Sequence, residues 1–239
     1  VRWCGPLSMY SSQNAELAEL HKQRLERQAA TAVPTKLHLV PDREPLLIQE
    51  FIGRHLGSQQ WPSGTLLGRA LLSGQIPVHL QGARVLELGS GVGVAGLAAA
   101  QCGASVTLSD LRDLLPMLET SIDLNRASFA QGSAAVAAVD WTGVLPAALV
   151  GGWDVVLAAD VLYVEKLFEP FLRTLLGVVA RSEETQVVLA YKERSVKDRE
   201  FLSTRVLPSF SVVHRMDLTH EGQTCELYVA SQPLLLPTP

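Results

Sequence analysis

Three acidic side chains stand where short apolar runs of the chain end, and their positions suit a nucleotide-like ligand. Glu87 lies two residues before Gly89, and Asp160 ends a later apolar run. Asp110 follows the glycine by roughly 20 residues, the spacing at which a carboxylate can accept hydrogen bonds from ribose hydroxyls. A carboxylate also attracts a cationic group. The three positions therefore predict a site for a nucleoside and for a positive charge.

The segment after Glu87 is rich in glycine and predicts a tight turn between a strand and a helix. Gly91, Gly93 and Gly96 form a Gly-x-Gly-x-x-Gly string, which permits a sharp bend and the close approach of a ligand. A dinucleotide would place its pyrophosphate at the helix N-terminus. S-adenosylmethionine carries an ammonium and a sulfonium instead, and Glu87 favours it because a carboxylate is a poor neighbour for pyrophosphate. Asp110 suits both ligands, and the structural alternatives are a core acid at Glu87 and a helix cap at Asp110.

Aromatic and polar side chains follow other apolar runs. Tyr163 comes three residues after Asp160, so both point toward the crevice expected at the carboxyl ends of parallel strands. Trp141 could stack on an adenine or pack in the core, and Trp61 is equally ambiguous. The turn 191–194 either lines the same crevice or is solvated.

The elements that must position these residues alternate in type from Arg84 onward. Buried strands that alternate with helices predict a parallel sheet covered on both faces, and the last two strands predict an antiparallel edge. The fold class is therefore α/β, a Rossmann-like doubly wound sheet of seven strands. The predicted strands are Arg84–Leu88, Ser105–Ser109, Ala134–Ala138, Trp153–Ala158, Gln186–Tyr191, Phe210–His214 and Cys225–Ala230, and the helices are Val94–Cys102, Leu114–Ala127, Leu167–Ala180 and Val196–Leu207.

The chain divides into three parts by composition. Residues 1–34 predict an N-terminal arm, helical over 13–30, and residues 233–239 predict a loose, proline-rich tail. The main domain spans residues 35–232. It begins with a predicted hairpin and a short helix, namely Lys36–Val40 with Pro45–Phe51 and then Thr65–Leu72.

Composition excludes several classes of protein. The 239 residues are 47% hydrophobic, enough for a sizeable core, and the net charge of −4 argues against binding nucleic acid by bulk charge. No apolar run approaches the roughly 20 residues that span a bilayer. The three cysteines, Cys4, Cys102 and Cys225, have neither disulfide nor metal-site spacing, which predicts a reducing compartment such as the cytoplasm.

The ordered set of residues resembles the class I seven-β-strand S-adenosylmethionine-dependent methyltransferases. More narrowly, it is similar to the family 16 methyltransferase-like protein lysine methyltransferases. The resemblance covers residues 35–230, and the order of the motifs is more selective than the glycine string alone. The matching positions are Trp61, Glu87-x-Gly89-x-Gly91, Asp110, Asn125, Trp141, Asp160-x-x-Tyr163 and Tyr191-Lys192-x-Arg194.

The resemblance implies roles for individual residues. The cofactor S-adenosylmethionine would be bound by Trp61, Glu87, Gly89, Ser90, Gly91, Gly93, Asp110, Leu111, Trp141 and Ala159. Asp160 and Tyr163 would border the channel for the target lysine as catalytic residues, while Tyr191 and Arg194 would line the substrate groove. Two features depart from the family pattern: Trp61 is followed by Pro62-Ser63-Gly64, and residues 1–34 match nothing in it.

The implied activity is N-methylation of a lysine in a protein substrate by a monomeric enzyme. Methyl transfer to an amine is a direct displacement that depends mainly on alignment, and the amine must arrive neutral. We expect Asp160 to bind and orient the amine and Tyr163 to shape the channel, with no dedicated general base and no metal. The alternatives are methylation of another side chain or of a small molecule, a non-catalytic binding module, and an NAD-dependent oxidoreductase.

Overall fold

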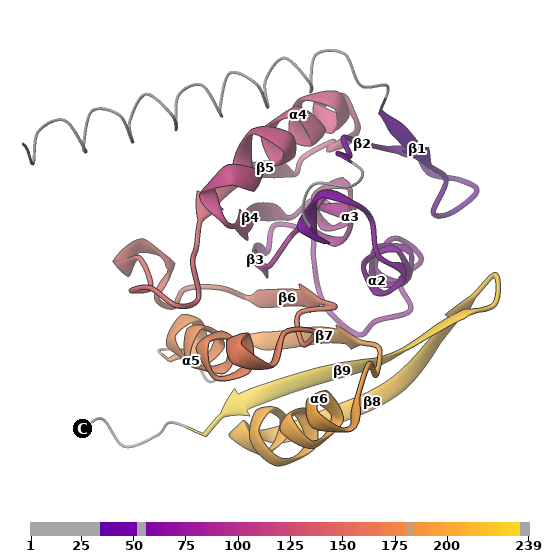
Figure 1. The fold of residues 1–239 in the computed structure, drawn as a ribbon. Coiled ribbons are helices and arrows are strands. Elements are labelled where there is room, and N and C mark those ends of the chain that lie inside the picture. Colours follow the sequence, from indigo (N-terminus) through magenta and orange to yellow (C-terminus); the bar gives the residue numbers. More distant parts are fainter. Residues whose placement is uncertain (1–33, 52–55, 181, 183, 235–239) are drawn as a thin grey trace, which may run out of the picture.

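The computed structural model describes residues 34–51, 56–180, 182 and 184–234 (Figure 1). The predicted arm helix over 13–30 lies outside the described residues, as do residues 235–239 of the predicted tail. Within the described part, no helix is both long and apolar enough to cross a bilayer.

A seven-stranded sheet forms the centre of the molecule, in the order β5-β4-β3-β6-β7-β9-β8. The strands from β5 to β7 pair in parallel, whereas β9 pairs antiparallel with both β7 and β8. The predicted fold class is confirmed, and the antiparallel strand β9 lies between β7 and the edge strand β8. The bounds are β3 Arg84–Leu88, β4 Ser105–Asp110, β5 Ser133–Ala138, β6 Val155–Ala159, β7 Gln186–Tyr191, β8 Phe210–His220 and β9 Gln223–Pro233.

Strand order reverses next to β3, and this places the ligand crevice. The chain passes from β3 outward through β4 to β5, and then returns to β6 on the other side of β3. In such a sheet the connections leave opposite faces and open a crevice outside the carboxyl ends of the two central strands. Glu87 lies in β3, while Asp110 and Asp160 stand at the ends of β4 and β6.

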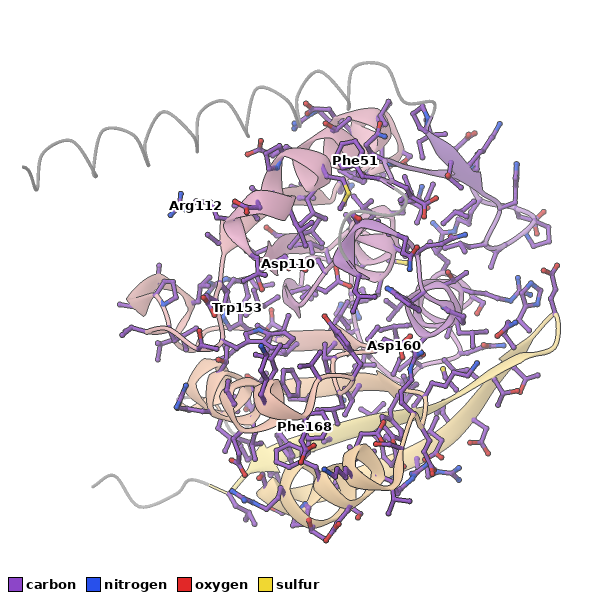
Figure 2. The ribbon with its side chains drawn as sticks, viewed as in Figure 1. Phe51, Asp110, Arg112, Trp153, Asp160 and Phe168 are labelled. Carbon is purple, nitrogen blue, oxygen red and sulfur yellow. The ribbon has the colours of Figure 1, made fainter. Side chains whose placement is uncertain are left out.

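Helices cover both faces of the sheet (Figure 1). Alternate residues of β6 show the division, because Val155 and Leu157 pack in one buried cluster and Val156 in the other. Helices α2, α3 and α4 contribute to the first cluster. Helix α5 contributes Phe168 (Figure 2) to the second cluster. Phe171 of the same helix also belongs to it. The helix bounds are α2 Pro62–Leu72, α3 Val94–Gln101, α4 Leu115–Asn125, α5 Phe168–Val179 and α6 Val196–Phe201.

The predicted N-terminal hairpin is confirmed, and it docks on α4. Strands β1 (Thr35–Leu37) and β2 (Leu46–Ile48) form a separate antiparallel pair. The Asn125 side chain accepts from the backbone N–H of Leu47 at 2.9 Å and donates to its carbonyl at 2.7 Å. Asn125 is therefore a structural clamp between the hairpin and the end of α4.

Several element boundaries differ from the prediction; helix α6, for instance, ends at Phe201 rather than at Leu207. Helix α2 begins at Pro62 rather than at Thr65, since proline at the first helical position needs no hydrogen-bond acceptor. Strands β8 and β9 are longer than the predicted Phe210–His214 and Cys225–Ala230. Polar residues such as Asp217 and Thr224 obscure the apolar pattern outside those runs, yet they pair across the ladder. Strand β9 also continues through Pro233, one residue past the expected domain boundary.

Candidate functional site

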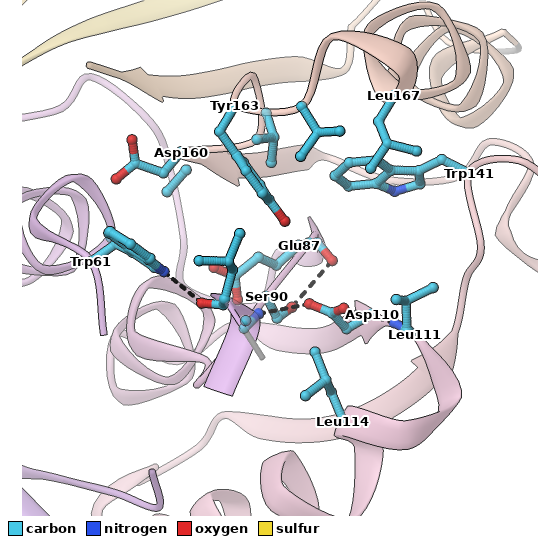
Figure 3. Close-up of a pocket in the computed structure, with 18 of the residues that line it drawn as sticks. Trp61, Glu87, Ser90, Asp110, Leu111, Leu114, Trp141, Asp160, Tyr163 and Leu167 are labelled. Carbon is cyan, nitrogen blue, oxygen red and sulfur yellow. Dashed lines mark hydrogen bonds between the residues drawn. The ribbon is translucent and has the colours of Figure 1, made fainter. Parts of the chain in front are cut away.

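A cavity of about 900 Å³ opens at the carboxyl ends of β3, β4 and β6 (Figure 3). The segment before α2 and the loops after β5, β6 and β7 complete its wall. Most of the residues predicted from the sequence meet here. The predicted residues that line the cavity are Trp61, Glu87, Gly89, Ser90, Gly91, Asp110, Leu111, Trp141, Ala159, Asp160, Tyr163 and Arg194.

The glycine turn after β3 is fixed to the end of β4. The backbone N–H groups of Gly89 and Ser90 both donate to the carbonyl of Ser109, at 2.9 and 3.0 Å. Gly89 has a φ of +69°, and a Cβ added there would lie 3.0 Å from the Trp141 ring. Only glycine gives this backbone both its left-handed conformation and its clearance from the ring.

Glu87 lies beneath this turn and is 3% exposed. Its Oε2 accepts from the backbone N–H of Gly96 at 3.1 Å. Burial raises the pKa of Glu87 to about 8, with the nearby charge of Asp110 adding to the effect, while hydrogen bonds from Ser90 and Gly96 oppose it. In the ligand-free protein Glu87 therefore carries a proton near neutral pH, and a cationic ligand group beside it would favour the ionised form.

Asp110 is held by both of its carboxylate oxygens. Oδ2 accepts from the backbone N–H of Gly91 at 2.8 Å, and Oδ1 accepts from that of Leu111 at 2.7 Å. Burial raises its pKa, and these two hydrogen bonds partly offset the rise. Each oxygen keeps a lone pair for a further donor, so the carboxylate can still accept from a pair of ligand hydroxyls.

Two tryptophans stand at different parts of the cavity wall (Figure 3). Trp141 packs edge-on against Phe171 of α5, with ring centroids 5.2 Å apart. The indole N–H of Trp61 donates to the carbonyl of Leu56 at 2.7 Å, and this bond fixes the segment before α2. Both rings therefore have a structural partner and also present an apolar surface to a planar ligand.

Asp160 has an unusual environment at the end of β6. Its φ is +54°, a conformation that is costly for a residue other than glycine, and its N–H donates to the Ala190 carbonyl at 3.0 Å. One carboxylate oxygen pairs with Arg194 Nη2 at 3.0 Å. The other oxygen, Oδ2, is buried and has no hydrogen-bond partner among the described residues. An unpartnered buried oxygen of this kind indicates a missing donor.

Tyr163 extends from the loop after β6, and its hydroxyl points into the cavity (Figure 3). The residue as a whole is 45% exposed to solvent. Burial of the hydroxyl, followed by the charge of Asp110, raises its pKa. The hydroxyl therefore stays protonated at neutral pH and remains both a donor and an acceptor.

Two predicted site residues do not line the cavity. Gly93 caps α3 with a φ of +85° and faces Leu118, which would lie 3.0 Å from an added Cβ. Tyr191 is buried in the second cluster, and the guanidinium of Arg199 stacks 4.8 Å from its ring centroid. Both predictions are wrong about contact with the cavity: Gly93 shapes the turn from behind, and Tyr191 belongs to the core.

Sequence reasoning also missed part of the cavity wall. The segment before α2 contributes Gly57 and Gln59, and the loop before α5 contributes Lys166 and Leu167. These residues lie in or beside single turns of 3₁₀ helix, Leu56–Ser58 and Glu165–Leu167, which are too short to carry a periodic signal that would show which side chains turn inward. Asp113, from the turn before α4, is a further missed lining residue.

The charges around the cavity favour a cationic ligand. Its lining includes the acidic side chains of Asp110, Asp113, Asp140 and Asp160, together with Glu87, whose buried carboxyl would ionise beside a cation. The basic residues of the lining are Lys166 and Arg194, and Arg194 is already paired with Asp160. A pyrophosphate would meet net repulsion here, whereas an ammonium and a sulfonium would not. No group of three or more metal-ligating side chains occurs in the described ranges.

Comparison with curated proteins links this geometry to an activity. The chain matches the model of a family described as lysine methyltransferase over residues 40–206. It is 35% identical to a protein N-lysine methyltransferase METTL21A of Danio rerio over 64% of this chain and 67% of that protein. An EEF1A lysine methyltransferase 3 of Mus musculus is 34% identical over 55% of this chain and 54% of that protein. The chain thus spans about two thirds or less of these relatives.

Solved structures share the fold at low sequence identity. TrmN from Thermus thermophilus gives a TM-score of 0.53 at 21% identity, covering 72% of this chain and 52% of that chain. The S-adenosylhomocysteine-bound magnesium protoporphyrin IX methyltransferase of Synechocystis gives 0.51 at 16% identity, covering 71% and 83%. Because the family match covers more than half of the chain, this protein belongs to the lysine methyltransferase family.

Proposed function

We propose that this chain methylates a lysine side chain in a protein substrate, with S-adenosylmethionine as the methyl donor. The observation that carries the proposal is the composition of one cavity. Asp110 and Glu87 lie on one side of it, and the Asp160–Tyr163 pair lies on the other (Figure 3). A cofactor bound beside Asp110 and Glu87 would therefore lie in the same cavity as an acceptor bound beside Asp160 and Tyr163.

The cavity residues fit the cofactor group by group. Asp110 would accept hydrogen bonds from the ribose hydroxyls, and Glu87 would lie near the cationic amino group. The rings of Trp61 and Trp141, with Leu111, would cover the apolar parts. When bound, the cofactor supplies a methyl group on a cationic sulfur, which makes the methyl carbon an electrophile.

The acceptor side requires an amine with a free electron pair. Asp160 would hold the amine through Oδ2, the buried oxygen that lacks a partner. Tyr163 would accept a hydrogen bond from the amine or donate one to Asp160, and its ring would narrow the channel. These contacts align the nitrogen with the methyl carbon, and alignment is the main advantage that a protein provides in a direct displacement.

Tritium transfer from labelled S-adenosylmethionine into extract proteins tests the proposal. We expect the wild type to label protein and amino-acid analysis to recover methyllysine. Asp160→Ala should lose this labelling at least about 100-fold, since an amine without its anchor is misaligned. Asp123→Ala is the matched control, because Asp123 is 68% exposed on α4 and lies outside the cavity.

Other outcomes identify the alternatives. Label recovered on a different amino acid, or in the small-molecule fraction, contradicts the proposal and defines another methyltransferase. Binding of S-adenosylhomocysteine without any labelling contradicts it in favour of a non-catalytic module.

A further inference from the structure

Arg194 makes two contacts at the acceptor end of the cavity. Its Nη2 lies 3.0 Å from Asp160 Oδ1, and its guanidinium carbon lies 5.2 Å from the centroid of the Trp61 ring. The side chain of Asp160 is only 7% exposed, whereas that of Arg194 is 36% exposed. The guanidinium therefore covers Oδ1, while Oδ2 is buried and has no hydrogen-bond partner among the described residues.

The turn that carries Arg194 is fixed by the elements around it. The carboxylate of Asp198 at the start of α6 accepts from the backbone N–H of Arg194 at 2.9 Å. Arg199 ties the same turn to β9, since its guanidinium lies 2.9 Å from Glu193 and 2.5 Å from Glu226. The guanidinium of Arg194 is thus placed by a braced backbone rather than by a free loop.

An unpaired carboxylate beside a lysine creates a difficulty for the proposed reaction. It stabilises the ammonium form and so raises the pKa of the amine, which must be neutral to react. A guanidinium on the far side of the same carboxylate opposes this effect. Within the described ranges, Arg194 is the cationic side chain that pairs with Asp160. The balance between these two charges would therefore influence the protonation of the amine.

We propose that Arg194 is a positioning residue that offsets the charge of Asp160, so that a lysine bound at Oδ2 loses its proton readily. The inference rests on the proposed function. The ammonium gives its proton to water before transfer. The nitrogen lone pair then forms the N–C bond while the C–S bond breaks with its electrons passing to sulfur, and the positive charge moves from sulfur to the methylated amine.

Other titratable groups face Asp160 but do not replace Arg194. Cys225 of β9 interacts with Asp160, but burial raises its pKa to about 12, so the thiol is neutral. The Tyr163 hydroxyl is also neutral, because its pKa is raised. Lys192 acts electrostatically on Cys225, and no ion pair joins Lys192 to Asp160 among the described residues. The remaining titratable groups of the cavity are Glu87, Asp110, Asp113, Asp140 and Lys166.

The test compares Arg194→Gln and Arg194→Met with Arg194→Lys, which keeps the charge. The probe is the recombinant protein that the wild type labels on lysine, assayed at saturating cofactor from pH 6.5 to 10. For the two neutral variants we expect kcat at pH 7.5 to fall about tenfold. We also expect the acid limb of the plot of kcat against pH to move to higher pH by about one unit. KM should stay equal or fall, because the ammonium binds well to an unpaired Asp160.

A second readout counts protons without catalysis. Calorimetry of the acceptor peptide binding to the S-adenosylhomocysteine complex, in two buffers of different ionisation enthalpy, gives the number of protons released. The wild type and Arg194→Lys should release close to one proton, and Arg194→Gln far fewer. Lys197→Gln is the control, since its exposed pair with Glu165 lies outside the cavity, and it should match the wild type.

The possible failures are separate. Lysine labelling with the same acid limb in all variants, or a uniform loss of kcat at every pH, overturns this inference alone. A wild type that labels no lysine overturns the proposed function and this inference with it.

Discussion

The backbone N–H of Gly91 donates to Asp110 Oδ2 at 2.8 Å, so the acid that ends β4 also fixes the turn that follows β3. The carbonyl of Ser109, the preceding residue, accepts from the first two N–H groups of that turn. The end of β4 thus organises the whole glycine loop. A ligand that binds Asp110 is held against a turn whose shape the same residue determines.

Asp110→Asn should therefore weaken cofactor binding more than it weakens the fold. An asparagine keeps one acceptor oxygen but presents an NH₂ group to a backbone N–H, and it loses the charge that strengthens hydrogen bonds from hydroxyls. We expect the affinity for S-adenosylhomocysteine to fall by about 10- to 100-fold, measured by calorimetry. Asp123→Asn, an exposed substitution on α4, should leave the affinity unchanged. Equal affinities for the two variants would contradict a ribose-binding role for Asp110.

Stability should decrease with rising pH because of Glu87. Its folded pKa of about 8 lies above the ordinary value of 4.5, so between these values the folded state binds a proton that the unfolded state does not. The resulting stability is present at low pH and is lost as pH rises toward 8. From pH 5.5 to 8.5 we expect denaturant unfolding to show a loss of about 2–3 kcal/mol in the wild type relative to Glu87→Gln.

The control for this measurement is Glu119→Gln, which removes an exposed carboxyl from α4. The unfolding free energy of Glu119→Gln should depend on pH as that of the wild type does. Parallel curves for the wild type and Glu87→Gln would show that Glu87 is ionised in the folded protein throughout this range.

Much of the fold could be predicted from the sequence because its signals are local. Buried strands such as Gln186–Tyr191 read as apolar runs, and the glycines after β3 mark a turn. The insertion of β9 between β7 and β8 is different, because pairing order depends on contacts between distant strands. The full length of these strands was hidden for a related reason: Asp217 looks like a loop residue until its neighbour across the ladder, Glu226, is known.

In the candidate site, too, the residues with a local sequence signal could be predicted, and those placed by contacts between distant segments could not. Asp110 and Asp160 could be predicted because strand ends in a parallel sheet share one edge. Gly93 and Tyr191 were misplaced because a motif spacing does not say which residue faces the ligand and which faces the core. The residues that complete the cavity, such as Gln59 and Lys166, come from short segments whose direction only the three-dimensional structure gives.

Gly96→Ala should destabilise the protein strongly, although alanine favours helices. A Cβ at this position would lie 2.1 Å from Leu108 and 2.6 Å from the carboxylate of Glu87. The helix or the strand beneath it would have to shift, and overpacking of this kind costs about 1–3 kcal/mol or somewhat more. Gly64→Ala in α2 is the matched control, since no atom lies within 4 Å of its added Cβ. Equal midpoints of denaturant unfolding for the two variants would contradict close packing of α3 on β3 and β4.

Acid should weaken the far edge of the sheet through Glu226. Hydrogen bonds from Arg199, and then from Tyr228 and Arg215, lower the pKa of this carboxyl to about 2, below its ordinary value of 4.5. A depressed folded pKa gives stability that is present above pH 4.5 and lost as pH falls toward 2. Glu226→Gln should therefore cost about 1–2 kcal/mol at pH 7 and flatten the acid limb of the unfolding free energy.

The matched control is Glu169→Gln, which breaks an exposed ion pair with Arg205. Exposed pairs contribute little, so its unfolding free energy should stay within about 0.5 kcal/mol of the wild type. The comparison also bears on the acceptor site, because Glu226 anchors Arg199 and Arg199 anchors the turn that carries Arg194. Glu226→Gln should thus lower kcat at neutral pH in the same direction as Arg194→Gln, but by less. An unchanged kcat together with reduced stability would show that the bracing of this turn matters for folding and not for the acceptor amine.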